Sequence, residues 1–239
     1  MVTVILKYRS KTGIKIVSVT LILTALIALL VLTAAWFFVT NPNPFQKSKV
    51  AGIGRSGKGA ASKELLETHV RAQVDIAPPR SEANPESLDR AANYIRMHLQ
   101  KAGLQTEDQI YQVGKAQYRT VRARIAGREK GLIVIGAHYD ICGDTPGADD
   151  NGSAVAGLLE LARLIGESGF PPRKSIELVA WTLEEPPHFR EDTMGSYVHA
   201  QSLVKQGEVP ALAISLEMLG FFSDEENSQS FHVWPLRLL

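Results

Sequence analysis

The pattern of apolar and polar positions predicts a body in which strands and helices alternate. Residues 131–137 and 175–182 are predominantly apolar, as expected for strands that are buried on both faces. Between them, residues 153–165 repeat apolar side chains with the period of a helix. A further helix over about 193–206 and a third strand over 211–216 complete a β-α-β-α-β order. This order is typical of a mostly parallel sheet covered by helices.

Two helices and two strands are predicted ahead of this alternation. Ser62 can cap the first helix, and Asn84-Pro85 begins a second helix that ends near Gly103. Strands are expected at about 107–113 and 117–126. The expected fold class is therefore α/β, with a mostly parallel sheet sandwiched by helices.

A long apolar run near the N-terminus predicts a membrane anchor. Residues 16–39 contain no charged side chain, and these 24 residues end in Trp36-Phe37-Phe38. As a helix they would be about 36 Å long, enough to cross a hydrocarbon core of about 30 Å. A cleavable signal peptide would have a shorter apolar region. We therefore expect a single transmembrane helix with aromatic residues at the interface.

The charges that flank this run predict its orientation and the layout of the chain. Basic side chains within residues 7–15 lie close to the run, whereas residues 40–46 beyond it are uncharged. The positive-inside rule then makes residues 1–15 a cytoplasmic tail. Residues 40–61, rich in Pro, Gly, Ser and Lys, are expected to form a flexible linker. Residues 62–239 would be an extracytoplasmic domain, either periplasmic or extracellular.

Composition excludes several classes of function. The chain has 239 residues and a net charge of +1, with 26 Lys and Arg against 25 Asp and Glu. No basic patch interleaves with aromatic residues, so a nucleic-acid partner is not expected. The single cysteine, Cys142, excludes an internal disulfide and a cysteine-rich zinc site.

Acidic and imidazole side chains follow the predicted strands of the core. His138 and Asp140 come after the first strand, Glu184 and Glu185 after the second, and Glu217 after the third. The carboxyl ends of parallel strands meet at one sheet edge, where α/β folds keep their ligand sites. Imidazole and carboxylate groups bind zinc, and this points to metal-assisted hydrolysis.

Taken singly, each of these residues also has a structural explanation. Asp149 and Asp150, in the loop that opens the next helix, could cap that helix. Glu184 and Glu185 precede two prolines and could form a solvated turn, and His138 could be a core histidine. Their gathering at the same end of consecutive strands favours a functional site.

Five segments resemble the co-catalytic zinc aminopeptidase family. They are Gly136–Asp140 (GAHYD), Pro146–Ser153 (PGADDNGS), Glu184–Glu185, Met194–Ser196 (MGS) and Ile214–Gly220 (ISLEMLG). The superfamily includes bacterial leucyl aminopeptidases, glutamate carboxypeptidase II, the glutaminyl cyclases and the non-catalytic transferrin receptor. The resemblance is specific in the order and spacing of its motifs.

The resemblance implies a role for each matching residue. His138 would bind one zinc ion, and Asp140 would hydrogen-bond its other ring nitrogen. Asp150 would bridge two zinc ions, and Glu185 would bind the second. Glu184 would be the general base that passes a proton from water to the leaving amine. The implied substrate is a peptide with a free N-terminus.

The sequence departs from the family pattern at two points. Glu217 stands where many members have Asp, so its expected role as a ligand involves a side chain longer by one methylene. The family pattern also has a later histidine ligand, and the one histidine after Glu217 is His232. We therefore expect a C-terminally incomplete domain whose second zinc is weakly held or absent.

The function expected from the sequence is a membrane-anchored zinc-dependent exopeptidase. Two alternatives stay open: a non-catalytic or fragmentary member of the same fold, and a glutaminyl cyclase-like enzyme with a single zinc.

Overall fold

The computed structural model describes residues 26–33, 36, 60–169 and 171–221. The chain divides into two units, residues 1–54 with 225–239 and residues 55–224, and each is considered by itself.

In the first unit, residues 26–33 and Trp36 are helical and exposed. No helix among the described residues is both long and apolar enough to cross a membrane. Most of the predicted anchor, residues 16–39, lies outside the described residues, so the anchor and the linker after it stay predictions.

The second unit contains every helix and strand predicted for the body. In chain order they are α2 (Lys63–Val74), α3 (Pro85–Lys101), β1 (Thr106–Val113), β2 (Ala116–Ile125), β3 (Glu129–His138), α4 (Ala154–Ser168), β4 (Lys174–Trp181), α5 (Gly195–Lys205) and β5 (Leu212–Ser215). An irregular helical turn, Ala148–Ser153, precedes α4. The predicted cap of α2 is confirmed, because the Ser62 hydroxyl accepts a hydrogen bond from Leu65 N at 3.2 Å.

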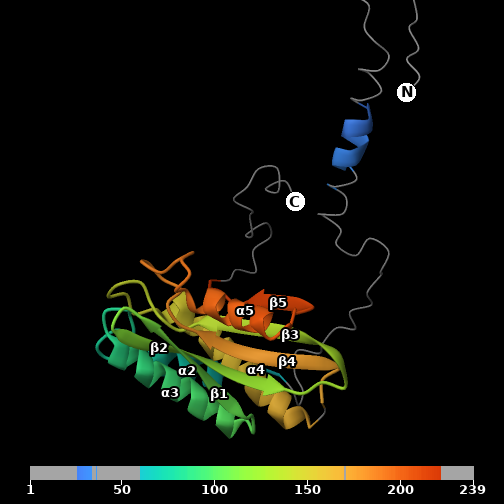
Figure 1. Cartoon of the computed structure of the whole chain (residues 1–239). Coiled ribbons are helices and arrows are strands. Elements are labelled where there is room, and N and C mark those ends of the chain that lie inside the picture. Colours follow the sequence, from blue (N-terminus) through green and yellow to red (C-terminus); the bar gives the residue numbers. More distant parts are fainter. Residues whose placement is uncertain (1–25, 34–35, 37–59, 170, 222–239) are drawn as a thin grey trace, which may run out of the picture. The chain divides into compact units, whose positions relative to one another are not determined.

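The strands form one mixed sheet in the order β1-β2-β4-β3-β5 (Figure 1). Strands β4, β3 and β5 are parallel, whereas β2 is antiparallel to both β1 and β4. The expectation of a mostly parallel sheet is therefore wrong for the β1–β2 side. Only Gly114 and Lys115 separate these two strands, and a two-residue connection joins antiparallel neighbours alone.

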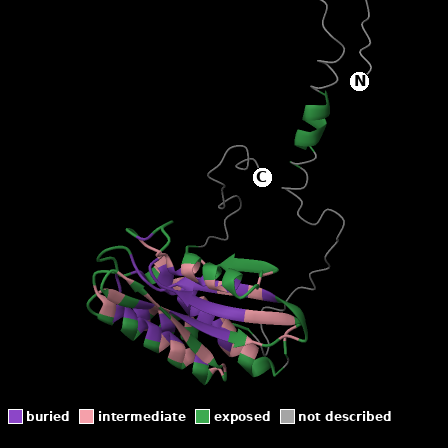
Figure 2. Cartoon of the chain, in the orientation of Figure 1, coloured by how far each residue is buried: buried purple, intermediate pink, exposed green. Residues whose placement is uncertain are grey.

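Helices cover both faces of the sheet, as predicted. Alternate residues of β3 and β4, such as Ala137 and Leu178, belong to the core shared with α3 and α4. Residues on the opposite face of the same strands, such as Val134 and Val179, pack with Leu203 of α5. Figure 1 shows α5 on the side of the sheet away from α2, α3 and α4, and Figure 2 shows the buried residues between these layers.

A buried polar network supports the α5 face of the sheet. Trp181 Nε1 donates to His199 Nδ1 at 3.3 Å, and His199 Nε2 lies 3.3 Å from Glu177 Oε2. The Arg122 guanidinium is 3.6 Å from the same carboxylate. His199 thus joins the end of β4 to a buried ion pair.

Two more histidines pack between the helices on the other face. His69 Nδ1 lies 2.8 Å from the Tyr94 hydroxyl, and the His69 and His98 rings meet edge to face with centroids 4.6 Å apart. Burial lowers the pKa of both residues, and that of His98 falls to about 4 with further repulsion from His69 and Lys101. Glu160 opposes the shift at His69 but does not cancel it.

We predict that this histidine pair makes the body less stable in acid. A histidine whose pKa is lower in the folded state than its unfolded value of about 6.5 binds more protons after unfolding. Its contribution is therefore fully present above about pH 6.5 and is lost as the pH falls toward 4. Urea denaturation between pH 4 and pH 7 should show a steeper loss of stability for the wild-type chain than for the His69→Gln, His98→Gln double variant. Parallel curves for the two proteins would contradict this assignment.

Candidate active site

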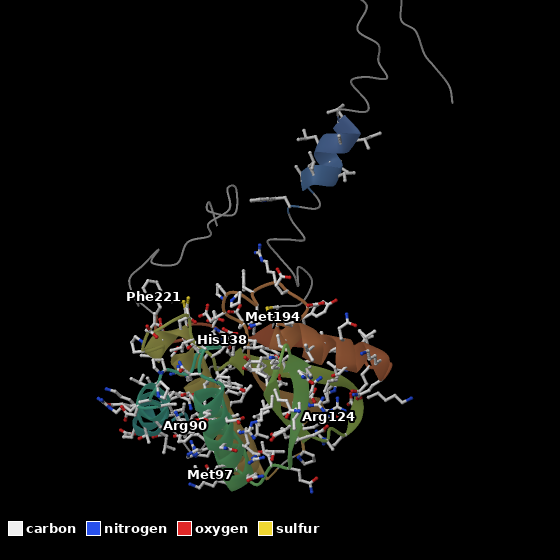
Figure 3. All side chains as sticks on the ribbon, turned by 60° about the vertical axis from the view of Figure 1, so that its left-hand side comes forward. Arg90, Met97, Arg124, His138, Met194 and Phe221 are labelled. Carbon is white, nitrogen blue, oxygen red and sulfur yellow. The ribbon has the colours of Figure 1, made fainter. Side chains whose placement is uncertain are left out.

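The parallel strands bring the predicted site residues to one edge of the sheet. His138 is the last residue of β3, Glu184 and Glu185 follow β4, and Glu217 follows β5. His138 lies at the same end of the body as Met194 and Phe221, away from Met97 (Figure 3). The strand order thus predicted correctly that these residues lie at one edge of the sheet.

Three carboxylates surround the outer ring nitrogen of His138. Its Nε2 atom lies 3.2 Å from Asp150 Oδ1, 3.4 Å from Glu217 Oε1 and 3.8 Å from Glu184 Oε2. The imidazole is only 3% exposed, whereas the Asp150 and Glu217 side chains are about half exposed. The histidine of the cluster is thus buried in the core, whereas these two carboxylates are accessible to solvent.

The inner ring nitrogen of His138 faces Asp140. Nδ1 lies 3.1 Å from the Asp140 carbonyl oxygen and 3.4 Å from its Oδ1 atom. The other carboxylate oxygen of Asp140 accepts a hydrogen bond from Glu185 N at 3.0 Å. Asp140, which is fully buried, therefore holds both the imidazole and the loop after β4.

The donor atoms fit a zinc ion. His138, Asp150 and Glu185 each offer a nitrogen or carboxylate oxygen, and these atoms lie within 4.8 Å of one another. Zinc binds this combination of ligands, and a metal-ligating histidine usually donates its second ring nitrogen to a carboxylate or carbonyl. Asp150 lies beside both His138 and Glu185.

Asp149 and Asn151, on either side of Asp150, fasten the loop that carries Glu217. Asp149 Oδ1 accepts from Gly220 N at 2.8 Å. The Asn151 amide accepts from Met218 N at 3.1 Å and donates to Glu217 Oε2 at 3.3 Å. Of the two adjacent aspartates, Asp149 thus has a structural role and Asp150 faces the imidazole.

Strained backbone adjoins two of the acidic residues. Leu183 and Met218 have φ values of 55° and 45°, a left-handed conformation that side chains with a Cβ rarely adopt. Each such residue costs on the order of 1–3 kcal/mol and persists where the surrounding structure holds it. Leu183 is completely buried, so its packing fixes the sharp turn from which Glu184 emerges.

Arg80, a buried residue beside the site that is 1% exposed, was not predicted from the sequence. Its Nε donates to Tyr139 O at 2.9 Å, and its Nη2 donates to Gly147 O at 2.5 Å. Its Nη1 donates to Gln73 O at 2.8 Å and to Pro146 O at 3.2 Å. Arg80 lies in the connection between two helices, where no hydrophobic period marks a residue as buried.

The acidic cluster creates a strongly negative potential. Burial disfavours the His138 imidazolium, but hydrogen bonds with Asp140 and Glu217 outweigh it and raise the pKa to about 11. Burial, together with Asp150, raises the pKa of Glu185 to about 7. Burial and neighbouring carboxylates also raise the pKa of Glu184. Carboxylates crowded in this way favour a bound cation.

Comparison with known proteins relates part of the chain to a peptidase family. Residues 120–233 match the model of peptidase family M28. A protein of Escherichia coli (strain K12) described as uncharacterized protein YfbL is 41% identical over 179 residues, or 72% of this chain and 54% of that protein. The chain thus spans about half the length of that relative.

Solved structures share the fold of the body. The glutaminyl cyclase of Porphyromonas gingivalis has a TM-score of 0.58 and 22% identity, covering 66% of this chain and 62% of that one. A leucine aminopeptidase precursor from Bacteroides thetaiotaomicron has a TM-score of 0.55 and 24% identity, covering 65% and 62%. At these identities the likeness concerns the fold alone. Residues 120–233 thus match a peptidase family M28 domain, in agreement with the resemblance of the motifs to the co-catalytic zinc aminopeptidase superfamily.

Proposed function

We propose that this chain is a membrane-anchored, zinc-dependent exopeptidase that removes residues from peptide N-termini. The observation that carries the proposal is the convergence of His138, Asp150 and Glu185 donor atoms within 4.8 Å, with the Glu184 carboxylate at the same cluster. The match to peptidase family M28 supports the peptide as substrate class.

His138, Asp150, Glu185 and Glu217 would hold the metal. When bound, zinc would lower the pKa of a water molecule and polarise the scissile carbonyl. Asp140 would keep the His138 ring in the orientation and tautomer that leave Nε2 free to bind, because it faces Nδ1.

Glu184 would act as the general base. Its side chain is only 26% exposed and lies beside His138, so it borders the place where substrate would bind. Burial raises its pKa above the usual carboxyl value, which strengthens it as a proton acceptor. In the reaction, its carboxylate would take a proton from the attacking water and then give it to the leaving amine.

A glutaminyl cyclase-like activity is the second candidate. The glutaminyl cyclases, which the motifs resemble, have Glu at the third acidic position of the family pattern. Here that position is Glu217, whose Oε1 atom lies 3.4 Å from His138 Nε2. Assays for release of a chromophore from aminoacyl anilides and for cyclisation of an N-terminal glutaminyl peptide separate the two reactions. Absence of both activities in a zinc-loaded chain would favour the non-catalytic alternative.

We predict that Asp150→Asn removes tightly bound zinc, whereas the adjacent Asp149→Asn keeps it. Asp150 faces His138, while Asp149 holds Gly220 through an oxygen that an asparagine amide can still supply. The loss of zinc affinity should exceed the roughly 10–100-fold that loss of a residue around the ligands causes. Metal analysis after dialysis measures it, and equal zinc content in both variants would contradict the assignment of Asp150.

We predict that Glu184→Gln lowers kcat by about 10²–10⁴-fold and leaves the zinc content unchanged, because a general base moves a proton without holding the metal. Glu191→Gln, an exposed position on the same loop, is the matched control and should keep full activity. If Glu184→Gln lost zinc together with activity, Glu184 would be a ligand instead.

We predict that the chain stays with membranes after high-salt and carbonate washes, and that deleting residues 1–40 releases it. The uncharged run 16–39 would be held by hydrophobic burial, which salt does not screen. Immunoblots of the pellet and supernatant measure the distribution. An intact chain in the supernatant, or an N-terminus just beyond Phe38, would exclude the anchor.

A further inference from the structure

We infer that Arg80 is a positioning residue that sets the metal affinity of the site by holding the His138 strand and the Asp150 loop at a fixed separation. The inference rests on the proposed function, because it assumes that these two residues bind metal. It concerns a side chain outside the segment that matches the family model.

The contacts of Arg80 lie on both sides of the gap between these two segments. Its guanidinium donates to Tyr139 O, between His138 and Asp140, and to the carbonyls of Pro146 and Gly147, just ahead of Asp150. The Arg80 carbonyl accepts a hydrogen bond from Ile141 N at 3.2 Å. Arg80 therefore contacts the residues on both sides of Asp140, Tyr139 through its side chain and Ile141 through its backbone. A planar group with fixed donor directions thus determines how far β3 and the loop stand apart.

A fourth bond ties this arrangement to the helix layer. The Nη1 atom donates to Gln73 O at 2.8 Å, in the last turn of α2. The loop can approach the guanidinium this closely because position 147 is glycine with φ of 59°. A Cβ there would lie 2.8 Å from Nη2 and 2.1 Å from the Ile141 side chain.

Burying the charged Arg80 side chain to connect two segments has an unfavourable free energy of desolvation. Arg80 forms no ion pair within 4 Å among residues 60–169 and 171–221, and burial lowers its pKa to about 10, against the attraction of Asp140 and Asp150. A buried cation without a direct partner carries a desolvation penalty. What it provides in return is four simultaneous hydrogen bonds to carbonyls, which neither lysine nor an apolar side chain can make.

Charge and geometry predict opposite effects on metal binding. A positive charge beside the site repels a divalent cation, so its loss by itself would tighten zinc binding. Loss of the bridge would let the Tyr139 and Gly147 segments relax, so that His138 and Asp150 no longer meet at 3.2 Å. When the arginine is replaced by an apolar residue, tighter zinc binding would therefore indicate the loss of charge, and weaker binding would indicate the loss of the bridge.

The experiment compares Arg80→Lys, Arg80→Met and Leu99→Ala in the full 239-residue chain. Zinc affinity is measured by competition with a chromophoric chelator, and the visible spectrum of the cobalt-loaded chain reports ligand geometry. Leu99 is a fully buried α3 residue, so its truncation lowers stability without changing the contacts of Arg80. Thermal melts give the stability of every variant.

We expect both Arg80 variants to bind zinc about 10–100-fold more weakly than the wild type and to change the cobalt spectrum. Leu99→Ala should lower the melting temperature alone. Zinc affinity at the wild-type value in Arg80→Lys, tighter binding in Arg80→Met, or equal weakening in Leu99→Ala would each overturn the inference. If Arg80→Met does not fold, Arg80→Lys decides.

The outcomes also separate this inference from the proposed function. A wild-type chain that binds no zinc would refute the proposed metal centre and the role of Arg80 with it. A wild-type chain that binds zinc, with Arg80 variants that bind it equally well, would refute only the role of Arg80.

Discussion

The parallel register of β3 between β4 and β5 is the constraint on which the candidate site depends. His138 pairs with Trp181 at the end of β4, and Gly136 pairs with Ser215 at the end of β5. The three strands therefore end at nearly the same level. A shift of one residue in either pairing would also turn the side chains of that strand to the opposite face. The packing that fixes the register, on α3 and α4 on one side and α5 on the other, thereby places the acidic residues around one imidazole.

This placement brings several carboxylates close together, and the fold compensates their mutual repulsion only in part. Carboxylates of Asp140, Asp150, Glu184 and Glu217 lie within 4 Å of His138, and their mutual repulsion opposes bringing them together. Without metal, the imidazole can reduce this repulsion by keeping a proton, and its pKa of about 11 expresses that tendency. A divalent cation neutralises more charge at the same place. The cluster is therefore better explained as a cation site than as a set of helix caps and solvated turns.

The sequence predicted what local periodicity and strand order determine, and it missed what depends on pairing or on isolated polar contacts. The apolar runs 131–137 and 175–182 indicated buried strands, and their order placed His138 and Glu184 at one edge. Nothing local showed that β2 pairs with β4, so this antiparallel pairing was missed. Periodicity could not distinguish Asp149 from Asp150, because one peptide unit separates them; the family resemblance assigned Asp150, and in the structure the Asp150 carboxylate faces His138. Arg80 was missed because its partners are backbone carbonyls, which a sequence does not display.

The candidate ligands are thus held by groups that are not ligands themselves. Each of the three loops is fastened by a different polar contact: Asp140 binds the loop after β4, Asn151 binds the loop after β5, and Arg80 binds the turn that leads to Asp150. All three contacts involve backbone N–H or C=O groups, whose positions are tied to the sheet and the helices. Flexible side chains such as Glu217, about half exposed, gain a defined position only through such contacts. Differences in metal affinity among chains with the same ligand residues should therefore arise from these supporting contacts, because they determine how much conformational entropy the ligands lose on binding.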